Sequence, residues 1–314
     1  MRITHGVMVN NFLSDMDNNL NTLNKLQRQA NTGKVFSKPS DDPFRVSRAM
    51  QMYAQINGNK QYNRNIKDVI NWMDTTDTAL NQITECLQRV EELIVSAGNA
   101  TYGTEEFLAI KEEINERVAE YGQILNTTFD GKYIFGGKDA MVRPIKIDST
   151  GGSNSIAING QKALIDQTLE IEISMGVRVE YTVNAVEVLE FSYKDELGNV
   201  SNMDVGALFS DILTNLNSST GKNKLLEENL GDIQKTLNNV LAVRARVGTM
   251  QNRMESAKKL NEAENFNLTE ILSSNEDVDV VEKAMEIAAA QTVYMASLQT
   301  SSKVLQPTIL DFLG

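Results

Sequence analysis

The sequence predicts a mainly α-helical protein, built as a discontinuous antiparallel bundle of long, coiled-coil-like helices with a small β-rich insertion. Two observations indicate the helices. Apolar residues recur in alternating steps of three and four over most of the chain, and only four prolines interrupt its 314 residues. A third observation indicates the insertion, because the apolar period changes to that of a strand within residues 141–202.

The composition excludes several classes of function. Lys and Arg together number 30 against 42 Asp and Glu, so the chain carries a net charge of −12 at pH 7. So acidic a chain is a poor binder of nucleic acid and of anionic membranes, and we expect neither as a partner. The chain has one cysteine, Cys86, and one histidine, His5, which disfavours a four-ligand zinc site or a Ser–His–Asp triad. We therefore expect no metal, no cofactor and no enzymatic activity.

The N-terminal segment, residues 1–42, is predicted to form an amphipathic helix with coiled-coil spacing. Its apolar seam steps by four and three and contains Val9, Leu13, Met16, Leu20 and Leu23. The segment lacks the apolar core of a signal peptide, and no run in the chain has the length of a membrane span. We expect a protein that is either cytoplasmic or exported without a cleaved signal.

A much longer helix is predicted from Pro43 to about Gly98. Asp42 is placed to cap its first turn, and proline is favoured at the first helical position. The adjacent proline makes this capping role a better interpretation of Asp41 and Asp42 than acid–base or metal chemistry. Beside the seam, Cys86 is interpreted as a small apolar filler rather than a redox residue. The seam itself contains Ile66, Val69, Met73, Thr76, Leu80, Ile83, Leu87, Val90 and Ile94.

Helical spacing continues on both sides of the insertion. Before it, a helix is predicted from Thr104 to about Asn126. After it, apolar stripes indicate helix over residues 226–257. These stripes contain Leu226, Leu230, Ile233, Leu237 and Val240, followed by Val247, Met250, Met254 and Ala257. We therefore expect 43–140 and 203–275 to form one discontinuous bundle.

The insertion, residues 141–202, is predicted to be a β-rich domain. From Thr168 to Asn184, apolar residues alternate with mostly polar ones, which is the period of a half-buried strand. Turns are predicted at Gly151–Gly152, Asn159–Gly160 and Gly198–Asn199.

The C-terminal segment, residues 276–314, repeats the amphipathic pattern of the N-terminal one. Its seam contains Ala288, Met295, Leu298, Leu305, Ile309 and Phe312. Pro307 is expected to kink this helix or to limit its last turn. Because burying one such seam returns less free energy than ordering the segment costs, we expect both ends to be loose in the free chain. They would become ordered by pairing with each other, with other subunits or with both.

Four segments make the chain resemble the flagellin superfamily, over about 1–140 and 205–314. The first contains Thr32-Gly33-Lys34 and then Ser40, Asp41, Asp42 and Pro43. The second spans Leu80–Ile83 and Leu87–Leu93, with Arg89, and the third runs from Asn126 to Gly137, with Tyr133, Phe135, Gly136 and Gly137. The fourth contains Arg246, Gly248, Asn252 and Arg253, together with the ending Leu305–Leu313. The first and third segments and the Asp311-Phe312-Leu313 ending resemble the flagellin-like hook-associated branch, type 3, of the hook–filament junction.

The resemblance implies a structural, self-assembling subunit of the bacterial flagellum. Its terminal helices would form the inner tube, and the insertion would face outward. Such a subunit would lie between the first hook-associated protein and the flagellin subunits, in a ring of like subunits. It would be exported by the flagellar type III route, and a flagellar export chaperone would hold its C-terminal end.

Other interpretations remain open on the sequence. The nearest is flagellin itself, the bulk filament subunit, and more remote ones are a cytoplasmic coiled-coil adaptor or an enzyme. Arg246 and Arg253 lie seven residues apart on one helix face, and their ion pairs could form within a subunit or between subunits.

Overall fold

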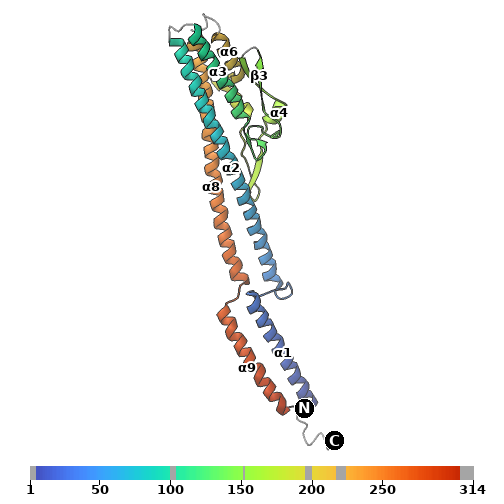
Figure 1. Cartoon of the computed structure of the whole chain (residues 1–314). Coiled ribbons are helices and arrows are strands. Elements are labelled where there is room, and N and C mark those ends of the chain that lie inside the picture. The colour runs from blue at the N-terminus through green and yellow to red at the C-terminus, as the bar shows by residue number, and fades with distance from the viewer. Residues whose placement is uncertain (1–4, 100–103, 151–152, 195–199, 217–223, 305–314) are drawn as a thin grey trace, which may run out of the picture. The chain divides into compact units, whose positions relative to one another are not determined.

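A computed structural model of the chain describes residues 5–99, 104–150, 153–194, 200–216 and 224–304 (Figure 1). The predicted fold class is confirmed, since long helices dominate and small antiparallel sheets accompany them. The chain divides into two compact units. Unit 1 comprises Met1–Gly58 and Ala263–Gly314, and unit 2 comprises Asn59–Glu262. The three-part division predicted from the sequence stays a prediction.

Unit 1 contains a pair of helices drawn from the two ends of the chain. Helix α1 (His5–Thr32) lies beside helix α9 (Val280–Val304), as Figure 1 shows. The unit also contains the start of α2 (Pro43–Asn99) and the end of α8 (Leu230–Glu276). A small apolar core joins these two, and it contains Phe36, Ala49, Met52, Ile56 and Leu272.

The start of α2 is fixed by two carboxylates that accept hydrogen bonds from backbone amides. The Arg45 amide donates to Asp42 Oδ1 over 3.0 Å, which is the geometry of an N-cap. The amides of Ser37 and Lys38 donate to Asp41 Oδ2 over 3.1 and 3.0 Å. These bonds hold the pKa of the Asp41 carboxyl below its ordinary value. The observed start at Pro43 confirms the predicted helix boundary.

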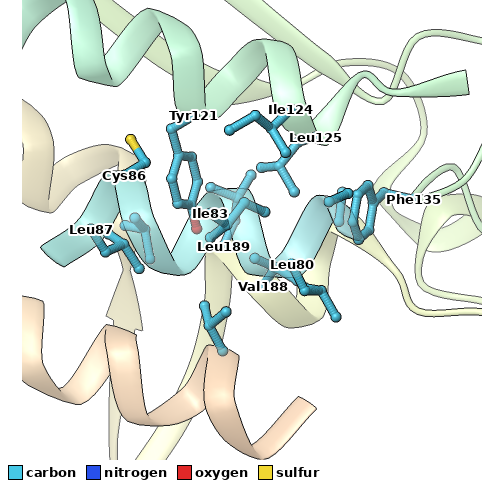
Figure 2. Close-up of a cluster of buried hydrophobic side chains, with 14 of the residues drawn as sticks. Leu80, Ile83, Cys86, Leu87, Tyr121, Ile124, Leu125, Phe135, Val188 and Leu189 are labelled. Atoms are coloured by element: carbon cyan, nitrogen blue, oxygen red, sulfur yellow. The ribbon is translucent and has the colours of Figure 1, made fainter. Parts of the chain in front are cut away.

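Unit 2 is built around the seam of α2, and every seam residue predicted between Ile66 and Ile94 is buried. Thr76, the polar member, donates its hydroxyl proton to the Trp72 carbonyl over 2.9 Å, so its burial leaves no donor unpaired. Helix α3 (Thr104–Leu125) confirms the second predicted helix. Figure 2 shows Tyr121 reaching from α3 toward Ile83 of α2, within the same cluster of buried side chains.

Helix α8, preceded by the π-helical turn η1 (Leu225–Asn229), runs antiparallel to α2 within unit 2. Gln234 donates to Glu91, Arg244 donates to Asp77, and Gln251 donates to Asp74. Residue numbers thus rise along α8 as they fall along α2. Helices from before and after the insertion therefore form one discontinuous bundle, as predicted.

Between α3 and α8, the described residues contain four two-stranded antiparallel hairpins. Their strands are β1 (Thr128–Phe129), β2 (Lys132–Tyr133), β3 (Ile145–Thr150), β4 (Ser153–Ile158), β5 (Glu170–Ser174), β6 (Val177–Glu180), β7 (Glu190–Lys194) and β8 (Val200–Asp204). Helices α4 (Lys162–Ile165) and α5 (Ala185–Leu189) lie between these hairpins in sequence, and α6 (Val205–Leu216) follows β8. Helix α6 lies within residues 203–275, which the sequence predicted to belong to the helical bundle, whereas α4, α5 and the β1–β2 hairpin were not predicted.

The alternating run from Thr168 to Asn184 was predicted to have strand structure, but the pattern located no turn within it. It forms the hairpin β5–β6, which turns at Met175–Gly176, where Gly176 has φ +75°. A left-handed residue reverses the chain without disturbing the apolar alternation, so the period alone concealed the turn. Gly160 also has a positive φ and confirms a predicted turn. The two other predicted turns, Gly151–Gly152 and Gly198–Asn199, lie outside the described residues.

Candidate assembly interface

In unit 1, the face of α1 that packs within the chain overlaps the predicted seam but differs from it. The buried and half-buried side chains on this face are Val9, Phe12, Met16, Asn19, Leu23, Leu26 and Gln29. They include three of the predicted seam residues. The other two, Leu13 and Leu20, are exposed at positions adjacent to this face. Helix α1 therefore carries apolar side chains on two neighbouring faces, one covered and one open.

In helix α9, the covered face and the predicted seam are further apart than in α1, where the two overlap. The half-buried residues of α9 are Lys283, Glu286, Ile287, Ala290, Tyr294, Ser297 and Ser301. Each described residue of the predicted seam lies one position C-terminal of a half-buried one, which is a rotation of about 100° around the helix. These seam residues, Ala288, Met295 and Leu298, are all exposed, and the last two expose 60% and 45% of their surface. Leu305, Ile309 and Phe312 lie outside the described residues.

The half-buried face of α9 includes Ile287 and Tyr294, but most of the large apolar side chains of this helix are exposed, namely Val280, Val281, Met285, Val293, Met295 and Leu298. Burying one Met or Leu side chain stabilises an interface by roughly 1.5–3 kcal/mol. A stripe of such side chains along one helix face is typical of a protein–protein contact. We call the described part of this stripe, Ala288, Met295 and Leu298, the open stripe of α9.

A polar clasp links the segment after α1 to the end of α8, inside unit 1. The Lys34 ammonium donates to Glu276 Oε1 over 2.7 Å and to the Tyr53 hydroxyl oxygen over 2.9 Å, and the Tyr53 hydroxyl also donates to Glu276. The hydrogen bond to Glu276, followed by that to Tyr53, raises the pKa of Lys34 above its ordinary value.

Two backbone hydrogen bonds extend the clasp. The Val35 amide donates to the Glu276 carbonyl oxygen over 2.7 Å, and the Val278 amide donates to the Gly33 carbonyl oxygen over 3.1 Å. These bonds fix the segments that connect α1 to α2 and α8 to α9. The sequence singled out Lys34 as part of a motif, but it did not indicate Tyr53 or Glu276 as its partners.

The Tyr133–Gly137 motif lies in unit 2, where it joins α3 to the hairpins. Phe135 is fully buried, and its carbonyl oxygen accepts the Ala185 amide over 2.9 Å. Gly137 has φ +56°, and a Cβ there would come within 2.1 Å of the Ile165 carbonyl oxygen. Only glycine fits this position, which gives the motif a structural reason. Tyr133 is half-buried and Gly136 is buried, and Ser40 of the first motif is exposed.

The predicted motif arginines have different surroundings. Arg89 donates to Glu113 over 2.8 Å and to Glu92 over 2.9 Å at the surface. Arg246 pairs with Glu187 of α5, so its ion pair is intramolecular. Arg253 and Asn252 are exposed, and Gly248 has open space where a Cβ would be. Sequence reasoning missed Arg244, which bridges α8 to Asp77 and Asn81 of α2.

The described side chains bring together no group of three His, Cys, Asp or Glu residues able to hold a metal ion. Within the same ranges, every helix is too short or too polar to cross a membrane.

Comparison with known proteins matches both helical regions to one family. Residues 3–140 match the bacterial flagellin N-terminal helical region, and residues 230–313 match the bacterial flagellin C-terminal helical region. Flagellin of Bacillus subtilis (strain 168) is 27% identical, over 98% of this chain and 99% of its own length. Flagellar hook-associated protein 3 of Escherichia coli (strain K12) is 25% identical, over 95% of each chain.

The fold is also similar to solved structures. Flagellar hook-associated protein 3 of Legionella pneumophila aligns with a TM-score of 0.61 at 14% identity, and the match covers 72% of this chain and 98% of that one. FlgL of Xanthomonas campestris aligns with a TM-score of 0.58 at 16% identity, over 71% of this chain and 99% of that one. At these identities, the likeness is one of fold.

Proposed function

Because the chain belongs to the flagellin superfamily, we propose that it is a structural, non-enzymatic subunit of the bacterial flagellum at the hook–filament junction. There it connects the first hook-associated protein to flagellin. Its relative in Escherichia coli carries the name flagellar hook-associated protein 3, and two solved hook-associated or FlgL structures share its fold.

The observation that carries this proposal is the open stripe of α9. Met295 and Leu298 are large apolar side chains that one copy of the chain leaves exposed, on a helix whose neighbouring face already packs on α1. A neighbouring subunit that covers this stripe would gain the free energy of apolar burial. The exposed Leu13 and Leu20 of α1 add to the same kind of surface. Assembly through the terminal helices therefore needs no side chain to leave its place in unit 1.

The proposal includes the route by which the subunit reaches this place. The subunit leaves the cell through the flagellar type III apparatus without a cleaved signal, and an export chaperone covers its C-terminal end beforehand. Outside the cell, like subunits form a ring through their terminal helices, with the insertion facing outward.

Flagellin itself is the second candidate function, favoured by one observation. The Bacillus subtilis flagellin matches nearly the full length of both chains, at slightly higher identity than the Escherichia coli hook-associated protein. A bulk filament subunit would use the same terminal helices but would polymerise along the whole filament.

Immunogold electron microscopy of intact flagella separates the two candidates. The antibody is raised against residues 141–202, which are predicted to face outward. We expect a single band of label between hook and filament. Label along the whole filament would identify a flagellin, and label confined to the cell would refute both candidates.

Variants of the open stripe test how the subunit assembles. Leu298→Asp places a charge on the stripe and is expected to abolish incorporation into flagella while unit 2 stays folded. Leu305→Asp extends the test to the predicted part of the seam. The matched control is Val200→Asp, which adds the same charge at an exposed apolar residue of β8. Normal incorporation of both leucine variants would contradict assembly through this seam.

A further inference from the structure

Unit 2 contains a surface cavity of about 530 Å³ that the proposed function does not use. Its volume is in the range of small-ligand sites, roughly 300–1,000 Å³. Residues of α2, of the β1–β2 hairpin and of the segment after β6 line it. The cavity therefore lies where three segments distant in sequence meet.

Three aromatic rings form one side of the cavity. Trp72 packs nearly perpendicular to Phe129 and to Tyr181, with ring centroids 5.9 and 6.0 Å apart. Trp72 exposes only 7% of its surface, whereas Phe129 and Tyr181 are half-buried. The latter two rings therefore present partly open aromatic surface to the cavity, and Trp72 supports them from beneath.

Carboxylates and an amide complete the lining. Asp68 and Asn71 lie on the exposed side of α2, adjacent to Trp72. Asp130 lies at the tip of the β1–β2 hairpin, where it and Gly131 have φ +51° and +74°, as in a type I′ turn. Neither carboxylate makes an ion pair within the described part of the chain, and Lys132 is the one cation of the lining. The lining therefore has an excess of negative charge.

This combination favours one class of ligand. Two carboxylates repel an anion. A neutral sugar could stack on the same rings, but it would leave the two carboxylates without a charged partner. A guanidinium group is planar, stacks on partly open aromatic rings and donates to carboxylates in a fixed fork. An ammonium group would pair with the carboxylates, but it is not planar and would make less contact with the aromatic rings than a guanidinium group.

We propose that this cavity binds the guanidinium group of an arginine side chain presented by a partner polypeptide. Asp68 and Asp130 accept its hydrogen bonds, while the rings of Phe129 and Tyr181 contact its plane. The site belongs to unit 2 alone, so it does not depend on where in the flagellum the subunit lies.

Trp72 is the only tryptophan of the chain, and this makes its fluorescence a direct reporter of the cavity. The full-length, unassembled chain is titrated with N-acetyl-arginine amide, which carries the guanidinium as its one charge. We expect a saturable change in Trp72 emission. N-acetyl-citrulline amide, the neutral isostere, should produce none. An equal response to both compounds, or no saturable response to the arginine compound, would overturn the proposal.

Variants then locate the binding. The double variant Asp68→Asn with Asp130→Asn is expected to raise the half-saturating concentration by about tenfold or more. The matched control is Asp211→Asn on α6, which removes the same charge outside the cavity and should leave binding unchanged. The single variant Asp68→Asn, on the exposed face of α2, serves as a second test if the double variant unfolds. Unchanged affinity in the folded carboxylate variants would also overturn the proposal.

Discussion

At the scale of single residues, the clasp of Lys34, Tyr53 and Glu276 joins segments far apart in the chain. The Glu276 side chain is 8% exposed, so its charge depends on the Lys34 ammonium and the Tyr53 hydroxyl. Lys34→Met would leave this carboxylate without its charged partner and destabilise the clasp by about 1–2 kcal/mol. Faster hydrogen exchange of the Val35 and Val278 amides would report the loss.

The control for this prediction is Lys146→Met, which removes a surface ion pair with Asp148. Exposed pairs are worth about 0–1 kcal/mol, so little change is expected there. Equal exchange rates in Lys34→Met and the unmodified chain would contradict the role of the clasp.

The clasp also has a predictable dependence on pH. The pKa of Lys34 is higher in the folded chain than in the unfolded one. The stabilisation from Lys34 is therefore fully present below about pH 10.5, the ordinary lysine pKa. It is lost as the pH rises through the higher pKa of the folded state. The Val35 amide should therefore be protected from hydrogen exchange at neutral pH and lose this protection only in strongly alkaline solution.

Cys86 gives a second prediction at this scale. Burial raises the pKa of its thiol to about 12, and Sγ donates to the Arg117 carbonyl oxygen. At about pH 8 the folded chain should therefore resist Ellman's reagent, because the thiolate is the reactive form. One thiol per chain should react in concentrated guanidinium chloride. Rapid reaction of the folded chain would contradict this interpretation of Cys86 as an inert apolar filler.

The residues that the sequence predicted well are those whose partners are local. Asp42 caps a helix that starts at the next residue, so its role follows from the order Asp-Pro. Glu276 contacts Lys34 across 242 residues, and no local pattern carries that information. The cavity around Trp72 could not be predicted for the same reason, because residues from three segments distant in sequence line it.

At the scale of elements, helix α2 has two kinds of buried polar residue, Thr76 within its seam and Asn59 before it. The Thr76 hydroxyl is satisfied inside its own helix, whereas Asn59 Nδ2 is buried without a hydrogen-bond partner in the described structure. Replacing an unpaired buried amide by an apolar side chain removes its desolvation penalty. Asn59→Leu should therefore raise the free energy of unfolding of unit 2 by about 1 kcal/mol.

Urea denaturation monitored by Trp72 fluorescence measures this change in unit 2. The comparison variant is Thr76→Val, expected to change the free energy of unfolding by less than about 1 kcal/mol, because the carbonyl of Trp72 keeps its helical partner. A lower urea midpoint for Asn59→Leu would show that its side chain contributes favourably to the stability of unit 2.

The elements also show why helices were easier to predict than strands. A heptad seam repeated over four turns or more defines α2 well, and its predicted residues are all buried. The short strands β5 and β6 share one alternating pattern, so period 2 could not locate the turn between them. In α1, Phe12 and Leu13 are adjacent apolar residues, so the pattern could not distinguish the covered face from the open one.

At the scale of the whole molecule, the net charge of −12 opposes association of like subunits. If apolar burial at the terminal helices drives assembly, screening this repulsion should favour it. We expect self-association to rise between about 50 mM and about 500 mM sodium chloride, as the screening length falls. Sedimentation velocity at both salt concentrations measures the change. A fall in association would indicate that ion pairs between subunits dominate.

The whole-molecule assignment depended on the order of four motifs rather than on any one of them. That order predicted the superfamily, which the comparisons confirm, whereas the apolar periods predicted the fold class, which the structure confirms. The structure was needed to explain why each motif has the residues it has. Gly137, for example, is required by a carbonyl of Ile165, which lies beyond the motif itself.

The hairpins between α3 and α8 have a consequence for how this lineage can vary. In the described ranges, each strand pairs only with its neighbour in sequence, and no hairpin shares a hydrogen-bonded edge with another. A gene can therefore gain, lose or exchange one hairpin without breaking a sheet common to the rest. The tip at Met175–Gly176, where Met175 is almost fully exposed, is a natural insertion point for an epitope or a fluorophore-binding tag. The surface of the subunit can thus diverge quickly while its helical pairs remain under the constraints of packing.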